Sequence, residues 1–344
     1  MLNKLSLKNT QFSLNTQEIT KKLFSGQPFD FNQLALEIYA YQVQYNPVYR
    51  RFVELLGKKE AHPSGIEEIP FLPIELFKTH WVSTAETVEK TFLSSGTTGT
   101  TPSRHPVKAL SVYHQSMIQA FNKAYGDFRD YVFLGLLPSY MEREGSSLLY
   151  MVDYFMKHSH FSSDCDYFLY DHKALKKKIE ELERQDKKII LIGVSYALLD
   201  FVEKHSMHLK NTIVMETGGM KGRRKELIKS ELHERLCKGF GVSTIHSEYG
   251  MTELLSQAYS SGSGIFKTSP TMRILIRDPY DPLHLYSEFG KRGGINVIDL
   301  SNIHSCSFIA TQDLGEKCST DSFKIHGRFD HADLRGCNLL VEAS

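Results

Sequence analysis

Short apolar runs alternate with amphipathic helical patterns through the middle of the chain, and this alternation limits the possible folds more than any other feature. Apolar runs bounded by turn residues are typical of buried strands, while the amphipathic patterns between them predict covering helices. We therefore predict an α/β fold, with a mostly parallel sheet covered by helices. Strands are predicted at 131–137, 189–194, 213–215 and from 245, and helices at 173–184, 197–205 and 223–238.

The two ends of the chain have other patterns. Apolar residues recur at helical spacing before residue 60, so residues 1–70 are predicted to form an N-terminal helical segment. The stretch 61–77 is rich in Pro and turn residues, and we predict that it connects this segment to the main body. Strand and turn patterns prevail after about residue 270, so residues 71–326 are expected to form an α/β domain with a β-rich end. Residues 327–344 are expected to be a short C-terminal tail.

Charge and cysteine content argue against several classes of partner and site. The 344 residues include 41 Lys and Arg against 40 Asp and Glu, a balance that gives no electrostatic case for a nucleic-acid partner. No apolar stretch reaches the roughly 18–20 residues of a membrane span, and the first residues lack the apolar core of a secretory signal. Five cysteines without a CxxC pair argue against a disulfide framework or a standard zinc site, and they favour a cytoplasmic protein.

A loop rich in Ser, Thr and Gly is the strongest candidate for phosphate binding. Glycines allow the backbone to approach a ligand, and backbone N–H groups and hydroxyls can donate to phosphate oxygens. No Gly-Lys-Ser/Thr ends the loop, so it is not a Walker loop. A flexible surface loop is the alternative interpretation. The candidate residues are Ser94, Ser95, Gly96, Thr97, Thr98 and Gly99.

Two further loops follow predicted strands. Gly218 and Gly219 permit a flat ligand to lie against the main chain, although a turn that leads into a helix explains paired glycines equally well. In the sequence SEYGMTE at 247–253, the hydroxyl of Thr252 and the carboxylate of Glu253 could serve a phosphate and its Mg²⁺ together. The alternative is a helix N-terminus with these two residues as capping residues.

Two short motifs near the end complete a recognisable order. Asp313 follows a predicted strand and could accept both ribose hydroxyls, and the motif GRFD follows at 327–330. A Ser/Thr/Gly loop, a GG turn, a YGxTE, a TxDLGE and a GRxD in this order resemble the adenylate-forming superfamily of acyl-CoA synthetases, adenylation domains and luciferases. The segments SSGTTG, LPSYMEREGSSLLYM, ETGGMKGR, HSEYGMTELLSQAY and GRFDHADLRGCNLLV resemble the LuxE family of acyl-protein synthetases.

This resemblance implies that ATP and Mg²⁺ activate a carboxylic acid, with a fatty acid as the first expectation, to acyl-AMP and pyrophosphate. The acyl group then passes to a thiol. Attack of one anion on another needs neutralisation of the phosphate charge by a metal and N–H donors. The resemblance implies that residues 94–99 contact the β- and γ-phosphates and that Thr252 contacts the α-phosphate. It implies that Gly218, Gly219 and Tyr249 contact adenine, that Asp313 contacts the ribose, and that Gly250 and Arg328 contact the nucleotide. Glu253 is the implied ligand of Mg²⁺.

Two departures from the superfamily pattern stand out. The phosphate loop of the superfamily usually continues Gly-x-Pro-Lys-Gly, whereas this chain has no lysine there and offers Arg104 as a substitute. Superfamily members also continue beyond GRxD into a mobile lid with a catalytic lysine, but this sequence ends 14 residues after Asp330. We therefore expect no lid domain, and Lys221 and Lys324 are the candidate replacements for its lysine.

Cys337 is the expected acyl acceptor, because the LuxE family accepts the acyl group on a cysteine close to the C-terminus. A thiolate is a strong nucleophile toward an acyl-phosphate anhydride, and the thioester that forms remains activated. Arg335 nearby could lower the pKa of the thiol. The plainer interpretation of Cys337 is a small apolar residue in a terminal strand.

Two other functions remain open from the sequence. One is an acid–thiol ligase that donates its acyl-AMP to CoA or to a carrier protein. The other is a non-catalytic nucleotide-binding module that serves a partner. For the acyl-protein synthetase, an acyl-CoA reductase-like protein or an acyl carrier is the expected protein partner, and Cys337, Glu253 and Thr252 are the expected catalytic residues.

Overall fold

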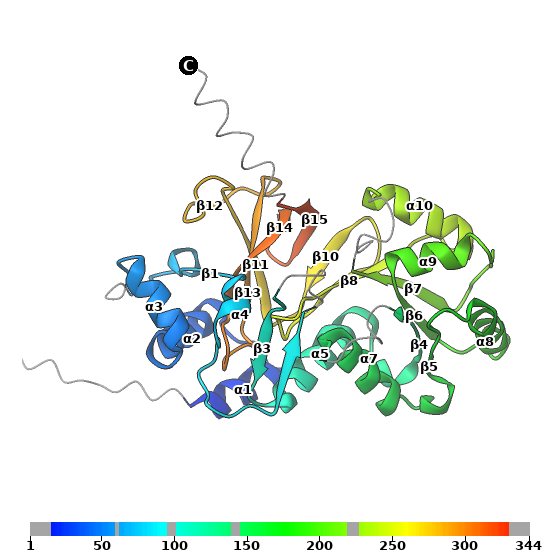
Figure 1. Ribbon diagram of the computed structural model, residues 1–344, viewed down its shortest axis with the longest axis horizontal. Coiled ribbons are helices and arrows are strands. Elements are labelled where there is room, and N and C mark those ends of the chain that lie inside the picture. Colours follow the sequence, from blue (N-terminus) through cyan, green and yellow to red (C-terminus); the bar gives the residue numbers. More distant parts are fainter. Residues whose placement is uncertain (1–14, 59–61, 95–100, 139–144, 219–226, 330–344) are drawn as a thin grey trace, which may run out of the picture.

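The computed structural model describes residues 15–58, 62–94, 101–138, 145–218 and 227–329 of the chain. Within these ranges one large mixed sheet, with helices around it, forms the body of the molecule (Figure 1). The strand order is β12-β11-β13-β14-β15-β10-β9-β8-β7-β6-β4-β5, and β1 pairs with β14. The predicted α/β class is confirmed. None of the helices in this part of the chain has the length and apolarity of a membrane span.

The parallel part of the sheet lies where the strand–helix alternation predicted it. Neighbouring strands from β5 to β8 run parallel to one another. The strand predicted at 189–194 is present at those bounds, and the others differ by a few residues at their ends. The strands are β4 (Val132–Leu136), β5 (Asp166–Tyr167), β6 (Ile189–Val194), β7 (Thr212–Thr217) and β8 (His246–Tyr249).

The helices of this part confirm the predicted alternation with some shifted ends. The helix predicted at 173–184 is α8, and the side chain of Asp171 caps it by accepting from Ala174 N at 2.9 Å. The predicted start at 223 for the last helix is wrong for the residues described, because Ile228 is extended and α10 begins at Lys229. The helices are α5 (Leu110–Tyr125), α7 (Ser147–His158), α8 (His172–Arg184), α9 (Ser195–Val202) and α10 (Lys229–Phe240).

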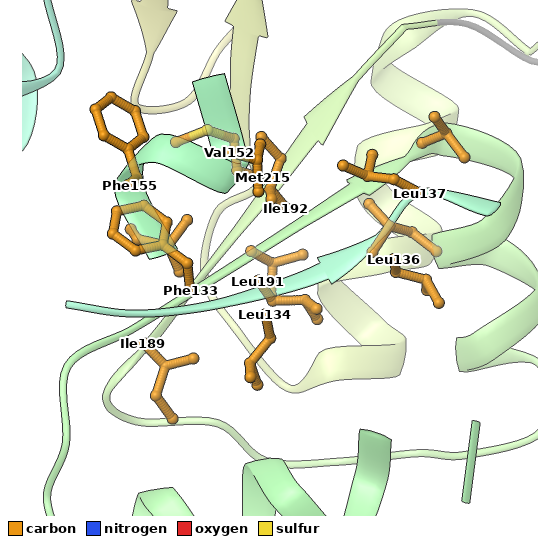
Figure 2. Close-up of a cluster of buried hydrophobic side chains, with 14 of the residues drawn as sticks. Phe133, Leu134, Leu136, Leu137, Val152, Phe155, Ile189, Leu191, Ile192 and Met215 are labelled. Carbon is orange, nitrogen blue, oxygen red and sulfur yellow. The ribbon is translucent and has the colours of Figure 1, made fainter. Parts of the chain in front are cut away.

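Helices cover both faces of the parallel strands. The Phe133 ring on β4 stacks against Phe155 of α7, with ring centres 5.4 Å apart (Figure 2). Leu136 is three positions further along β4 and therefore faces the opposite side. Its partner in the register is Gly193, where an added Cβ would come within 2.7 Å of Leu198 on α9. Buried apolar side chains thus hold α7 and α9 on opposite faces of the sheet.

The C-terminal strands continue this sheet in antiparallel order. β8 pairs antiparallel with β9, and antiparallel pairing continues to β12. The predicted β-rich end is therefore an extension of the main sheet, because its strands hydrogen-bond directly to the parallel part. These strands are β9 (Ala258–Ser260), β10 (Ile265–Thr268), β11 (Met272–Arg277), β12 (Leu285–Tyr286), β13 (Arg292–Asp299), β14 (Phe308–Ser319) and β15 (Ser322–Arg328).

The predicted connection at 61–77 contains regular structure of its own. It forms the short turn η1 (Ile66–Glu68), the strand β1 (Leu72–Pro73) and the start of α4 (Leu76–Thr79). β1 pairs parallel with β14, so the connection contributes a strand to the main sheet. A separate ribbon of β2 (Lys90–Leu93) and β3 (Arg104–Val107) flanks the Ser/Thr/Gly loop.

The predicted N-terminal helices are α1 (Thr16–Phe24), α2 (Phe31–Tyr45) and α3 (Pro47–Leu55) (blue in Figure 1). α2 and α3 lie on the side of β1, whereas α1 packs against α5, where Gln119 Nε2 donates to Leu23 O at 3.1 Å. All three helices share one apolar cluster with the antiparallel strands. Gln42 Nε2 donates to the carbonyl oxygens of Asn302 and Ile303 at 3.0 and 2.9 Å, and Asn46 Nδ2 donates to Ser305 O at 2.9 Å. These buried hydrogen bonds attach α2 and its C-terminal end to the turn after β13. A domain boundary near residue 70 stays a prediction.

Candidate active site

The candidate site lies where the sheet changes from parallel to antiparallel pairing, at the carboxyl ends of β7 and β8. Ligands of open α/β sheets bind at such carboxyl ends, in the loops that follow the strands. Eight of the predicted site residues fall in the described part of the chain, and they come from separate loops and strands. They are Ser94, Gly218, Tyr249, Gly250, Thr252, Glu253, Asp313 and Arg328.

Tyr249, Asp313 and Arg328 form one hydrogen-bonded group. The Tyr249 hydroxyl donates to Asp313 Oδ2 at 2.8 Å, and Arg328 Nε donates to Asp313 Oδ1 at 3.1 Å. Asp313 and Arg328 are direct partners in the register of β14 and β15. Each carboxylate oxygen has two lone pairs, so Asp313 retains acceptor capacity beside these two donors.

Tyr249 is buried and Arg328 is exposed, and this difference determines what each side chain can donate to. The Tyr249 ring is buried against the edges of Phe266 and Phe323. Burial and the neighbouring Asp313 carboxylate raise its pKa well above the usual value, so its hydroxyl stays a neutral donor. The Arg328 side chain is 77% exposed, so its remaining N–H groups face solvent while Nε holds Asp313.

Glu253 is a buried carboxyl group at the base of the Ser/Thr/Gly loop. Only 5% of it is exposed, and this burial raises its pKa. A hydrogen bond from the Ser103 side chain and the positive charges of Arg328 and Lys78 act in the opposite direction and favour the carboxylate. The structure therefore brings a predicted metal ligand within electrostatic range of Arg328, which is predicted to contact the nucleotide.

The ends of the Ser/Thr/Gly loop are held together beside Glu253. Ser103 N donates to Ser94 Oγ at 2.8 Å, and Ser94 N donates to Ser103 O at 3.0 Å. Because Ser103 also hydrogen-bonds Glu253, the loop predicted to bind phosphates starts and ends next to the residue predicted to bind Mg²⁺.

The donor set around Glu253 fits a metal ion that a nucleotide brings with it. No group of three His, Cys, Asp or Glu residues in the described ranges could hold a metal ion. Mg²⁺ commonly binds one or two carboxylates and completes its shell with phosphate oxygens and water. A single buried carboxylate next to the ends of a loop predicted to bind phosphates is consistent with that mode of binding.

Thr252 and Glu253 lie in a turn, and the alternative that they cap a helix is wrong. Residues 250–257 contain no helix, and Leu254 N donates to Met251 O at 3.1 Å. Side chains from elsewhere hold this backbone instead. A ring nitrogen of His105 lies 2.7 Å from Thr252 O, and Asn302 Nδ2 donates to Glu253 O at 2.8 Å.

Gly218 lies directly after β7, in a backbone conformation that favours glycine. Its φ angle is +64°, which L side chains rarely adopt. Ser195 Oγ donates to Gly218 O at 2.8 Å and to Glu216 Oε2 at 3.1 Å. Glu216 is buried, and its interactions with His233 and Lys229 outweigh burial and lower its pKa to about 2, with Lys229 Nζ 2.9 Å from Oε1. Ser195 therefore links the turn that bears Gly218 to the ion pair of the buried Glu216 with the partly exposed Lys229.

Glu248 is a buried carboxyl group that sequence analysis missed. Burial raises its pKa to about 7, and Thr217 Oγ1 donates to its Oε2 at 2.6 Å. An added Cβ at residue 250 would lie 2.4 Å from Glu248 Oε1, so a larger residue there would require the Glu248 side chain to move. A perturbed carboxyl group beside a candidate site is a common sign of function.

Nine other candidate residues lie outside the described residues, and their roles stay predictions. They are Ser95, Gly96, Thr97, Thr98, Gly99, Gly219, Lys221, Arg335 and Cys337. Lys324, one candidate for the missing lysine, forms an ion pair with Glu316 at 3.2 Å. Arg104, the candidate substitute in the phosphate loop, is exposed on β3.

No family model matches the sequence, and no curated protein matches it. Solved structures do match the fold. ATP-bound MatB from Rhodopseudomonas palustris has a TM-score of 0.51 at 15% identity, over 69% of this chain and 47% of that one. The long-chain-fatty-acid-CoA ligase FadD1 from Archaeoglobus fulgidus has a TM-score of 0.52 at 14% identity, over 75% and 55%.

A third match is O-succinylbenzoate coenzyme A synthetase (MenE) from Bacillus subtilis in complex with ATP and magnesium ion. Its TM-score is 0.50 at 17% identity, over 71% of this chain and 50% of that one. Over the matched part, the chain has the fold of these ligases. It spans about half the length of these ligases.

Proposed function

We propose that the chain activates a carboxylic acid with ATP, with a fatty acid as the first expectation, and then transfers the acyl group to a thiol. The observation that carries this proposal is that the Glu253 side chain is hydrogen-bonded by Ser103, at the base of the Ser/Thr/Gly loop, and is stabilised by the positive charge of Arg328, which in turn holds Asp313. A phosphate loop, a candidate metal ligand and a candidate ribose ligand thus meet at one end of the sheet.

The chemistry has two steps. In the first, a carboxylate oxygen of the acid attacks the α-phosphorus of ATP, the bond from this phosphorus to the bridging oxygen breaks, and pyrophosphate leaves with the electron pair. In the second, a thiolate attacks the acyl carbon and AMP leaves. Mg²⁺, when bound, would neutralise phosphate charge.

Each described residue has a proposed role in these steps. Glu253 would hold Mg²⁺, and Thr252 would contact the α-phosphate. Asp313, oriented by Tyr249 and Arg328, would accept from the ribose hydroxyls. The exposed N–H groups of Arg328 are available to the nucleotide.

Cys337 is the proposed first acceptor of the acyl group, which makes the chain an acyl-protein synthetase of the LuxE type. Support comes from the resemblance of the last segment, GRFDHADLRGCNLLV, to that family. A thioester at Cys337 keeps the acyl group activated for an acyl-CoA reductase-like partner or an acyl carrier.

A screen of carboxylic acids for ATP–pyrophosphate exchange tests the first step. Exchange that depends on the acid supports the proposal, and nucleotide binding without any exchange supports the non-catalytic module instead. Saturated fatty acids of several lengths, short acids and aromatic acids should all be included, so that the substrate class follows from the same experiment.

A labelled acid tests the second step. The full-length protein should acquire a covalent label that hydroxylamine releases, and Cys337→Ser should form acyl-AMP without that label. Cys318→Ser is the matched control, because Cys318 is a free thiol on β14 and should not be needed. Label that persists in Cys337→Ser, or that appears only on added CoA, would favour the acid–CoA ligase.

A further inference from the structure

Two buried side chains hold the consecutive carbonyl groups of Thr252 and Glu253. One ring nitrogen of His105 lies 2.7 Å from Thr252 O, and Asn302 Nδ2 donates to Glu253 O at 2.8 Å. His105 lies 147 positions from Thr252 in the sequence, on β3, and Asn302 is in the turn after β13. Both contacts are therefore products of the tertiary structure.

The two side chains also contact each other. The second ring nitrogen of His105 lies 2.9 Å from Asn302 Oδ1, and the Phe77 ring packs against the edge of the imidazole, with ring centres 5.9 Å apart. His105 is fully buried, and only 1% of Asn302 is exposed. A neutral imidazole has one N–H and both of these oxygens accept, so His105 donates to Thr252 O or to Asn302 Oδ1 but not to both at once. Buried polar groups are costly unless they are hydrogen-bonded, so these contacts favour the observed geometry of the turn.

A third buried residue holds the backbone just beyond. Asp299 Oδ2 accepts from Leu255 N at 2.8 Å and from Ser256 N at 3.0 Å. The backbone is thus fixed on both sides of Leu254 although no helix or strand runs through this segment.

β3 connects this arrangement to the phosphate loop. Ser103 closes the base of the Ser/Thr/Gly loop and hydrogen-bonds the Glu253 side chain, while His105, two positions later, holds the main chain at Thr252. The same short stretch therefore contacts both the side chain of Glu253 and the backbone that carries it.

We infer that His105 and Asn302 are positioning residues that orient Thr252 and Glu253, beside Ser103 at the base of the Ser/Thr/Gly loop, for Mg²⁺ and ATP. This inference rests on the proposed function. Neither residue needs to touch the nucleotide, because each acts through the backbone of the turn.

The test compares two variants with two matched controls in the full-length protein. The variants are His105→Gln and Asn302→Ala. Asn46→Ala is the control for Asn302→Ala, because Asn46 is equally buried and donates at 2.9 Å to Ser305 O instead of to the backbone at 252–253. His304→Gln is the control for His105→Gln, because the imidazole of His304 is largely buried and lies near the Thr84 hydroxyl at 3.4 Å.

The first readout is the Mg²⁺ concentration that gives half-maximal ATP–pyrophosphate exchange. We expect it to rise about tenfold in His105→Gln and in Asn302→Ala, since each loses a buried hydrogen bond that orients the site. The double variant should be less than additive, because both residues hold one turn. The two controls should lose stability without this change in Mg²⁺ dependence.

The second readout is hydrogen exchange of the amides at 254–257, which needs no activity. Exchange there should be faster in both variants than in the controls. Unchanged hydrogen exchange together with an unchanged Mg²⁺ dependence would overturn the inference. Absence of acid-dependent ATP–pyrophosphate exchange in the wild type would overturn the proposed function alone. If Asn302→Ala does not fold, Asn302→Ser and His105→Asn give the same two readouts.

Discussion

The Tyr249 hydroxyl lies 2.8 Å from Asp313 Oδ2 and joins two residues that are 64 positions apart in the sequence. Tyr249 is the last residue of β8, and Asp313 lies in β14, which is separated from β8 by three strands in the sheet. The contact connects the YGxTE motif to the TxDLGE motif. Tyr249 of one motif therefore hydrogen-bonds the carboxylate of the other motif.

Tyr249→Phe should weaken both ATP binding and the fold. Loss of the hydroxyl leaves the buried Asp313 with one donor fewer, and we expect a loss of about 1–2 kcal/mol of stability and a severalfold rise in KM for ATP. Tyr49→Phe is the control, because the Tyr49 hydroxyl is buried and donates to Pro70 O at 2.6 Å away from the site. Pyrophosphate-exchange kinetics and urea unfolding measure both effects. An equal KM in the two variants would refute the proposed role of the contact.

Glu253→Gln should abolish acid-dependent pyrophosphate exchange without destabilising the protein. Burial raises the pKa of Glu253, so a neutral amide of the same shape costs little there and can even raise Tm. Glu316→Gln on β14 serves as the control and should remain active. Thermal unfolding and the exchange assay test both statements, and residual exchange near the wild-type rate would remove Glu253 from the mechanism.

Glu248 should make the protein less stable as the pH rises. Its pKa is raised from 4.5 to about 7 in the folded protein, so the folded state retains the proton that the unfolded state releases. The stability present below pH 4.5 is therefore lost progressively up to about pH 7, by at most about 3 kcal/mol. Urea unfolding of wild type and Glu248→Gln between pH 5 and about pH 8 measures this term. The variant should show a flatter dependence, and identical slopes would contradict the assignment.

Glu216 should have the opposite pH dependence. Its folded pKa is lowered from 4.5 to about 2, so its contribution to stability is present above pH 4.5 and is lost as the pH falls toward 2. Lys229→Met removes the ammonium group 2.9 Å from the Glu216 carboxylate and should cost about 2–3 kcal/mol at neutral pH. Adding Glu216→Gln to Lys229→Met should recover most of that loss. Chemical denaturation of Lys229→Met, Glu216→Gln and the double variant provides the measurement, and purely additive losses would show that the pair is not coupled.

Local sequence patterns predicted much of the parallel part of the sheet. The apolar run at 189–194 is a strand at those bounds, and Asp171 caps α8 as expected. Such elements depend on neighbouring residues, because strand burial and helix capping are set within a few positions. The start of α10 was predicted too early, since no capping residue marks it.

The candidate site was only partly predictable. Tyr249, Glu253, Asp313 and Arg328 belong to motifs with recognisable spacing, and the structure brings these four together. His105 and Asn302 belong to no such motif. Their importance depends on hydrogen bonds across 147 and 49 positions, and no local pattern contains that information.

The sequence by itself determined the strand–helix alternation, the order of the motifs and the residue types available for phosphate, metal and ribose. Only the tertiary structure decided that the β-rich end extends the main sheet, that 250–257 is a turn without a helix, and that Glu248 is a buried acid with a raised pKa. The reason is physical. Strand and helix preferences act between near neighbours, whereas sheet order, burial and buried hydrogen bonds depend on which distant segments pack together.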